Sequence, residues 1–263
     1  MKYLHSRNRA ILREMVSTDF KVRYQGSVLG YMWSLLKPLF LFAILYFVFT
    51  YIIPLGKDVP HYPVYLLTGV ILWSFFTEAT TIGAGSVVAS GDLIRKISIP
   101  RYLVVLASSL SALINLGLSL IVIFIFALLN GVMPTFEWFL IIPIIVELFI
   151  FALGVSFLLS AAYVKFRDIT YIWEIFLQAG FYATPIIYPL TNVPVGLHKW
   201  FFMNPMTQII QDARYVLVTD TSITIWSTIH SIVVVAPFVV IIALAIIGGV
   251  YFKRRSKYFA EDI

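Results

Sequence analysis

The side chains best suited to chemistry are three glutamates within long apolar stretches, Glu78, Glu147 and Glu174. Carboxylates inside a membrane serve proton relays and ion-coupled carriers, which commonly carry inverted repeats. The sequence has no evident inverted repeat and no evident facing acidic pair. The pattern therefore indicates that these glutamates form hydrogen bonds within a helical bundle. The alternative is that the protein is an ion-coupled carrier.

Metal binding and catalysis have little support in the sequence. The chain has no cysteine, and its 4 histidines show no ligand spacing. A phosphate-binding P-loop requires G-x-x-x-x-G-K-[ST], and no such string occurs. We therefore predict no catalytic residue, no metal and no cofactor bound by this chain.

The composition indicates an integral membrane protein. Hydrophobic residues make up 60% of the 263 positions, charged residues make up 12%, and the mean hydropathy is +0.93. Soluble domains carry about 25% charged residues. No long polar stretch is left over for a second domain. We predict one all-α transmembrane domain over residues 1–263.

Long apolar runs predict six transmembrane helices, since about 20 mostly apolar residues cross a hydrocarbon core. A row of small residues, Ala152, Ser156 and Ser160, would let a neighbouring helix approach the fourth run closely. The predicted bundle covers residues 30–252, with runs at 30–53, 62–84, 103–129, 138–163, 170–189 and 227–252.

Basic residues predict the orientation, because cytoplasmic loops carry the excess of Lys and Arg. With six crossings, 16 of the 19 basic residues fall on the side of both termini, and the other side has Lys57, Lys199 and Arg214. Both termini are therefore predicted to be cytoplasmic, including the tail 253–263. The net charge of +6 follows from this rule, so we predict no nucleic-acid partner.

A basic amphipathic helix is predicted over residues 1–28. Its apolar stripe comprises Leu4, Ile11, Leu12, Met15, Val16 and Phe20, set among basic side chains. Such helices lie in the membrane interface on the cytoplasmic side. The segment would serve either as part of a partner-docking surface or as a simple anchor.

The segment 190–226 is too polar to span the membrane and contains Pro194 and Pro205. Irregular backbone at membrane depth is tolerated where protein buries it or where it lines a watery cavity. We predict a re-entrant helical hairpin that forms an external gate, and an amphipathic loop on the membrane surface is the alternative. The gate candidates are Trp200, Phe201, Asn204 and Pro205.

Four ordered motifs carry a resemblance to a known family. They are KVRYQGSVLGYMWSLLKPL at 21–39, RKISIPR at 95–101, KFRDI at 165–169, and TPIIYPL at 184–190 followed by NP at 204–205. Together they resemble the membrane subunit of polysaccharide-exporting ABC transporters, the TagG/Wzm-like branch of the type-2 ABC permeases. The resemblance covers essentially the whole chain.

The resemblance implies a multi-pass protein of the cell membrane that works as a homodimer with two copies of a cytoplasmic nucleotide-binding subunit. ATP and Mg would bind to that partner, not to this chain. The expected substrate is a lipid-linked polysaccharide such as O-antigen, teichoic acid or a cell-wall glycan, moved outward. A drug or lipid exporter of the same superfamily is the alternative.

Charged residues at the cytoplasmic ends of spans are the candidates for coupling to the ATPase and for binding a lipid pyrophosphate. The resemblance implies a coupling role. The alternative is that these charges only reflect the excess of Lys and Arg in cytoplasmic loops. The coupling candidates are Asp92, Arg95, Lys96, Lys165, Arg167 and Asp168. A pyrophosphate calls for Lys or Arg, and its candidates are Lys37, Arg95, Lys96 and Arg101.

Aromatic and polar residues share a helical face in the first and fifth runs. Sugars present apolar C–H faces edged by hydroxyls, so such faces would suit a glycan tunnel between two protomers, the lining that the resemblance implies. The alternative is packing against lipid or in interfacial aromatic belts. The tunnel candidates are Trp33, Lys37, Phe40, Phe47 and Tyr51, then Gln178, Phe181, Tyr182 and Tyr188.

Overall fold

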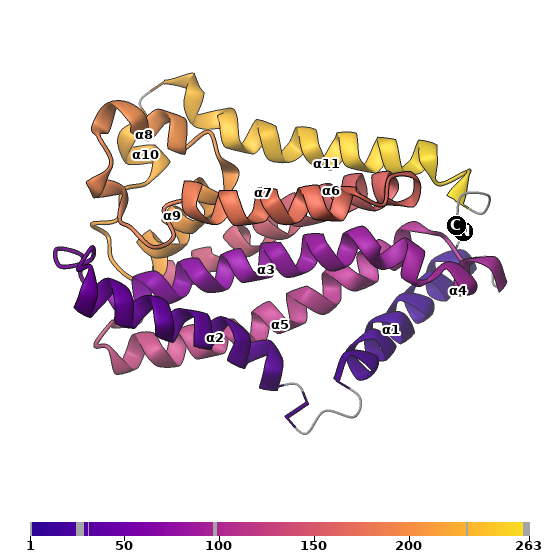
Figure 1. Ribbon diagram of the computed structural model, residues 1–263, viewed down its shortest axis with the longest axis horizontal. Coiled ribbons are helices and arrows are strands. Elements are labelled where there is room, and N and C mark those ends of the chain that lie inside the picture. Colours follow the sequence, from indigo (N-terminus) through magenta and orange to yellow (C-terminus); the bar gives the residue numbers. More distant parts are fainter. Residues whose placement is uncertain (1, 25–28, 31, 97–98, 230, 260–263) are drawn as a thin grey trace.

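The computed structural model describes residues 2–24, 29–30, 32–96, 99–229 and 231–259, and every element within them is helical (Figure 1). The longer helices are α1 (Lys2–Tyr24), α2 (Met32–Phe47), α3 (Tyr62–Ala89), α5 (Tyr102–Leu129), α6 (Ile141–Lys165), α7 (Ile169–Ala183), α9 (Pro205–Leu217) and α11 (Ala236–Arg255). The shorter ones are η1 (Val48–Ile52), α4 (Gly91–Lys96), η2 (Phe136–Leu140), η3 (Leu190–Asn192), α8 (Val195–Phe201), α10 (Ile225–Thr228) and η4 (Ile232–Val235).

Five helical stretches of the described chain are long and apolar enough to cross a membrane. They are Met32–Ile52, Tyr62–Ala89, Tyr102–Leu129, Phe136–Lys165 and Ile232–Arg255. They coincide with five of the six predicted runs. The prediction of an all-helical membrane protein is therefore confirmed.

The remaining run, 170–189, forms the shorter helix α7. Its 15 residues rise roughly 22 Å at 1.5 Å per residue, less than a hydrocarbon core of about 30 Å. The helix ends before Thr184, which is extended (φ −93°, ψ 137°). Thr184 precedes Pro185, and a residue before proline is disfavoured in helical geometry. The chain therefore leaves the helix there and continues irregularly.

Helix α3 is at the centre of the bundle. In the apolar stretch that contains α3, 72% of the residues are buried, whereas only 6% are buried in the stretch that contains α2. Helix α3 packs against α5 and α6, and α6 packs against α11. In Figure 1, α2 and α11 lie at opposite edges of the bundle. Helix α2 thus exposes most of its apolar surface.

Small residues of α6 let two helices approach it closely, as predicted from the row that includes Ser156. The Ser156 hydroxyl donates to the Ala79 carbonyl of α3 at 3.1 Å. On the side facing α11, a Cβ added to Gly154 would lie 2.7 Å from the Ala245 Cα atom. Such contacts replace the hydrophobic drive that is missing between helices in lipid.

The predicted N-terminal helix is present as α1, which packs against the start of α5. The Asn8 side-chain amide donates to the Tyr102 hydroxyl at 3.5 Å. Met1 and residues 25–28 of the predicted segment, and the side chains of Leu4 and Phe20 in its stripe, lie outside the described residues.

Helices α8, α9 and α10 gather at the end of the bundle opposite α4 (Figure 1). Helix α9 packs against α3, α6 and α11, and its Ile209, Ile210 and Ala213 are fully buried. Asn204 caps this helix, because its side chain accepts from the Met206 amide at 3.0 Å. Pro205 occupies the first helical position, where no backbone donor is needed.

Candidate functional site

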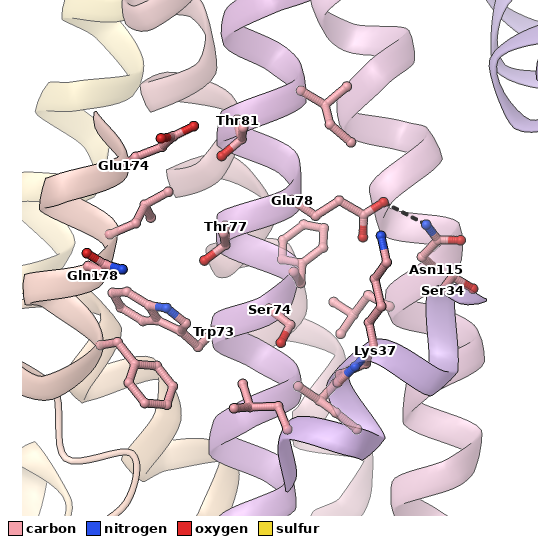
Figure 2. Close-up of a pocket in the computed structure, with 18 of the residues that line it drawn as sticks. Ser34, Lys37, Trp73, Ser74, Thr77, Glu78, Thr81, Asn115, Glu174 and Gln178 are labelled. Carbon is pink, nitrogen blue, oxygen red and sulfur yellow. Dashed lines mark hydrogen bonds between the residues drawn. The ribbon is translucent and has the colours of Figure 1, made fainter. Parts of the chain in front are cut away.

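A cavity of about 1120 Å³ lies between α2, α3, α5 and α7 (Figure 2). We call it the α2–α7 groove. Its walls combine charged, amide and hydroxyl groups with aromatic rings. The polar lining comprises Ser34, Lys37, Ser74, Thr77, Glu78, Thr81, Asn115, Ser119, Glu174 and Gln178, and the aromatic lining comprises Trp33, Trp73, Phe75, Tyr171, Phe181 and Tyr182.

The polar centre of one wall is formed by Lys37, Glu78 and Asn115, from three different helices. The Asn115 amide donates to the Glu78 carboxylate at 2.7 Å. Figure 2 shows the Lys37 side chain pointing toward both groups. This wall therefore presents a cation, a carboxylate and an amide to the groove.

Helix α7 forms the facing wall. Glu174 and Gln178 are one turn apart on this helix, and both side chains are exposed. Trp73 of α3 meets Phe181 edge-on, with ring centroids 6.1 Å apart. The indole N–H of Trp173 donates to the Thr80 hydroxyl at 3.0 Å, which ties α7 to α3. The second wall thus offers polar groups beside aromatic rings.

The groove includes five of the nine predicted tunnel residues. They are Trp33, Lys37, Gln178, Phe181 and Tyr182. The other four lie outside its lining, and the Tyr188 hydroxyl donates to the Tyr182 carbonyl at 3.1 Å. Phe40, Phe47 and Tyr51 are 59%, 58% and 69% exposed on the outer face of α2 and η1.

Sequence reasoning missed the contribution of α3 and α5 to the groove. Ser74, Thr77 and Thr81 recur at spacings of three and four along α3, so they share a helix face. That spacing indicates a polar face on α3. The face is hard to recognise in the sequence because α3 is surrounded by protein and is therefore apolar on nearly all sides. Asn115 and Ser119 of α5 are also four residues apart and were missed as well.

The segment after α7 is held by the buried guanidinium of Arg214, which is 0% exposed. It donates to the carbonyls of Tyr65 at 3.0 Å, Pro185 at 2.6 Å and Ile186 at 2.7 Å. It also donates to the Gln211 side-chain carbonyl at 2.9 Å. The distribution of basic residues in the sequence predicts only that Arg214 lies on the outer side. One side chain thus joins α9, α3 and the irregular segment.

An acidic pair lies between α6 and α9, although none was evident in the sequence. The Gln208 amide donates to Asp212 at 2.7 Å and to Glu147 at 3.4 Å. Glu147 belongs to a membrane span and Asp212 to α9. The pair escaped notice because the two carboxylates are 65 residues apart and only one is in an apolar run.

The remaining candidates lie at the two ends of the bundle. Lys165, Arg167 and Asp168 are exposed at the turn between α6 and α7, and the Arg167 guanidinium lies 5.1 Å from the Tyr163 ring centroid. Asp92 is exposed in α4, and the side chains of Arg95 and Lys96 lie outside the described residues. Of the gate candidates, Trp200 is 61% exposed, Phe201 and Asn204 are half-buried and Pro205 is buried.

The fold and the groove define a multi-pass helical membrane protein with a polar, aromatic-lined cavity between its helices. Among the described residues, no group of three or more acidic or histidine side chains could hold a metal ion. Residues 12–218 match the model of the ABC-2 type transporter family. The chain therefore belongs to that family, which confirms the resemblance carried by the four motifs.

Relatives of this chain have names from polysaccharide export. It is 29% identical to the O-antigen export system permease protein RfbA of Klebsiella pneumoniae over 252 residues, 95% of this chain and 94% of that protein. The protein of the same name from Myxococcus xanthus is 24% identical over 97% of this chain and 96% of its own. The polysialic acid transport protein KpsM of Escherichia coli is 22% identical over 74% and 76%.

Proposed function

We propose that this chain is the permease subunit of an ATP-driven exporter that moves a lipid-linked polysaccharide outward across the cell membrane. The observation that carries the proposal is the α2–α7 groove, in which Lys37, Glu78 and Asn115 face aromatic rings across one cavity. The names of the relatives support the same substrate class.

The groove suits a glycan because it offers two kinds of contact side by side. Flat rings such as Trp33 and Phe181 match the apolar C–H faces of sugars, and their contact tolerates sliding. Carboxylate and amide groups such as Glu174 and Gln178 match the hydroxyl edges. A substrate that must advance through the site needs many weak contacts of this kind instead of one tight pocket.

A second copy of the chain would complete the tunnel. The outer face of α2 and η1 carries Phe40, Ile44, Phe47 and Tyr51, each more than half exposed. An exposed apolar face of this length in a membrane protein contacts either lipid or another subunit. In the proposed homodimer, this face would pair with α7 of the second protomer. That pairing would extend the aromatic lining along the translocation path.

Six crossings with both termini in the cytoplasm fit the course of the chain. In Figure 1, α2, α3, α5, α6, α7 and α11 run in alternating directions between the two ends of the bundle. In this arrangement α7 and the irregular residues 184–190 form the fifth crossing. The α8–α10 region then lies outside as the re-entrant gate, with Trp200 and Phe201 at the end of α8 and Asn204 and Pro205 at the start of α9.

ATP hydrolysis belongs to a separate subunit in this proposal, with ATP and Mg bound there. Two copies of that subunit would contact the cytoplasmic elements of the dimer. The coupling surface comprises Asp92, Arg95 and Lys96 of α4 and Lys165, Arg167 and Asp168 at the α6–α7 turn. Lys37, Arg95, Lys96 and Arg101 are the candidates for contact with a lipid pyrophosphate.

The proposal is tested by export of long surface glycan in cells that depend on this chain. Trp33→Ala and Phe181→Ala are expected to reduce export several-fold at unchanged protein abundance. Phe136→Ala and Phe139→Ala are matched controls, because these rings are 92% and 70% exposed and lie outside both the groove and the proposed gate. Normal export by both groove variants would remove the tunnel assignment. Transport without ATP by the purified chain would instead indicate an ion-coupled carrier.

A further inference from the structure

A second cavity, of about 620 Å³, lies at the other edge of the bundle. It is lined by the start of α5, the middle of α6 and the end of α11. It shares no lining residue with the α2–α7 groove. The lining comprises Ile99, Pro100, Arg101, Tyr102, Phe157, Gly249, Phe252, Lys253 and Ser256. We call it the α5–α11 cavity.

The mouth of the α5–α11 cavity is positively charged. Arg101 directly precedes α5, and Lys253 lies in the last turn of α11. Neither side chain makes an ion pair or hydrogen bond with a described residue, and the described lining includes no carboxylate. The Tyr102 hydroxyl accepts from Asn8 at 3.5 Å and keeps its own proton for donation. Arg101, Lys253 and Tyr102 all line the cavity and carry hydrogen-bond donors that an anion can accept from.

The depth of the cavity is apolar. Phe157 lies eight residues before the end of α6 at Lys165, which corresponds to about 12 Å along the helix axis. Its ring packs against Phe252, with centroids 5.0 Å apart. Gly249 leaves space beside these rings, because a Cβ added there would meet nothing within 4 Å. The cavity thus runs from cationic groups at the helix ends to an aromatic wall within the span.

We propose that the α5–α11 cavity binds one anionic phospholipid, with its phosphate between Arg101 and Lys253 and an acyl chain against Phe157. A guanidinium can donate two hydrogen bonds to one phosphate, and basic pockets between transmembrane helices bind anionic lipid head groups. Two cations at the mouth disfavour a zwitterionic head group, whose own cation they repel. A free phosphate would leave the apolar depth unfilled. The inference that the lipid comes from the cytoplasmic leaflet rests on the proposed topology. Binding of the phospholipid does not depend on glycan export.

The test is native mass spectrometry of the full chain, purified in mild detergent with the subunits that accompany it. Phosphatidylglycerol and phosphatidylcholine are added as probes at equal concentration. One retained phosphatidylglycerol per chain is expected, at about 25-fold higher affinity than in the double variant Arg101→Gln/Lys253→Gln, since each basic group contributes about fivefold. The matched control is Arg254→Gln/Lys257→Gln, which removes two exposed charges of the same region outside the cavity.

A second variant keeps the charges and fills the cavity. Gly249→Leu places a side chain in open space, so it is expected to fold normally and to lose the lipid. Equal affinity for both lipids, or equal loss in the two charge variants, would overturn the proposal. Displacement by glycerol phosphate at the same concentration would show a site for soluble anions instead. Glycan export is compared in Gly249→Leu, because this variant keeps Arg101, which is also a candidate for contact with the substrate pyrophosphate. Normal export by Gly249→Leu with loss of the lipid, or loss of export with the lipid retained, separates this inference from the proposed function.

Discussion

The guanidinium of Arg214 lies 3.5 Å from the centroid of the Tyr65 ring and donates to the backbone carbonyl of the same residue at 3.0 Å. Helices α9 and α3 are therefore joined at one point by a cation–π contact and a hydrogen bond. The other donors of Arg214 bind the carbonyls of Pro185 and Ile186 after α7 and the Gln211 side chain. This arrangement satisfies backbone groups that would otherwise be orphaned where α7 ends.

Replacing Arg214 by lysine is expected to destabilise the protein. Lysine has no planar fork, so its ammonium cannot reach the carbonyls of Tyr65, Pro185 and Ile186 together. Each buried carbonyl left without a donor costs about 1–3 kcal/mol, so a loss of about 3 kcal/mol or more is expected for Arg214→Lys. The thermal unfolding midpoint in detergent measures this. The control is Lys199→Gln, which changes an exposed charge of α8; equal midpoints for the two variants would contradict the role of Arg214.

Gly69 of α3 is expected to tolerate no side chain. A Cβ there would lie 2.6 Å from the Arg214 Nη2 atom, so Gly69→Ala must displace the guanidinium. The predicted effect is a lower unfolding midpoint and reduced glycan export. Gly85→Ala is a control in the same helix, because its Cβ would meet nothing within 4 Å. If Gly69→Ala were as stable as Gly85→Ala, the close packing at Arg214 would be refuted.

The contact between α6 and α11 depends on Gly154. With Gly154→Leu, the new side chain meets the Ala245 backbone, so α11 must move outward and lose its packing. We expect a fall of about 2 kcal/mol or more in the free energy of unfolding, measured in detergent or bicelles. Gly117→Leu on α5 has open space at the Cβ position and provides the comparison. A larger loss in the Gly117 variant would reverse this interpretation.

The acidic pair between α6 and α9 predicts opposite effects for two substitutions. Glu147 and Asp212 are half-buried, and their carboxylates repel each other when both are charged, so Asp212→Asn is expected to preserve or raise stability. Gln208→Leu removes the amide that donates to both Glu147 and Asp212 and is expected to cost about 1–3 kcal/mol. Urea or thermal unfolding compares them, with the exposed Asp220→Asn as the reference. Destabilisation by Asp212→Asn comparable to that of Gln208→Leu would argue against repulsion between the carboxylates.

The groove wall formed by Glu78 and Asn115 should affect export as well as stability. Asn115→Leu removes the hydrogen bond to Glu78 and one amide from the glycan path, so export is expected to fall several-fold. Ile114→Leu, at the neighbouring position on the exposed side of α5, is the control. Surface glycan per permease molecule, measured at equal abundance, tests this. Wild-type export by Asn115→Leu would exclude Asn115 from the path.

The sequence by itself determined that the chain is a helical membrane protein, because hydropathy and length act locally on each segment. The stretches containing α2, α3, α5, α6 and α11 were recognisable for that reason. Helical spacing also placed Trp33 and Lys37 on one face of α2. Ordered motifs such as KFRDI at 165–169 indicated the family, because they could be read along the chain without knowing which helices meet.

Only the tertiary structure decided which helices enclose a cavity and which polar groups meet. Arg214 and Tyr65 are 149 residues apart, and Asn115 and Glu78 come from different spans. Hydropathy places each residue at a membrane depth but does not specify its neighbour across the bundle. Those neighbours follow from helix packing, in which small residues such as Gly154 and Ser156 set the approach of α11 and α3. Arg214 was therefore read from the sequence as an outer-side charge, whereas the fold buries it as the link between three segments.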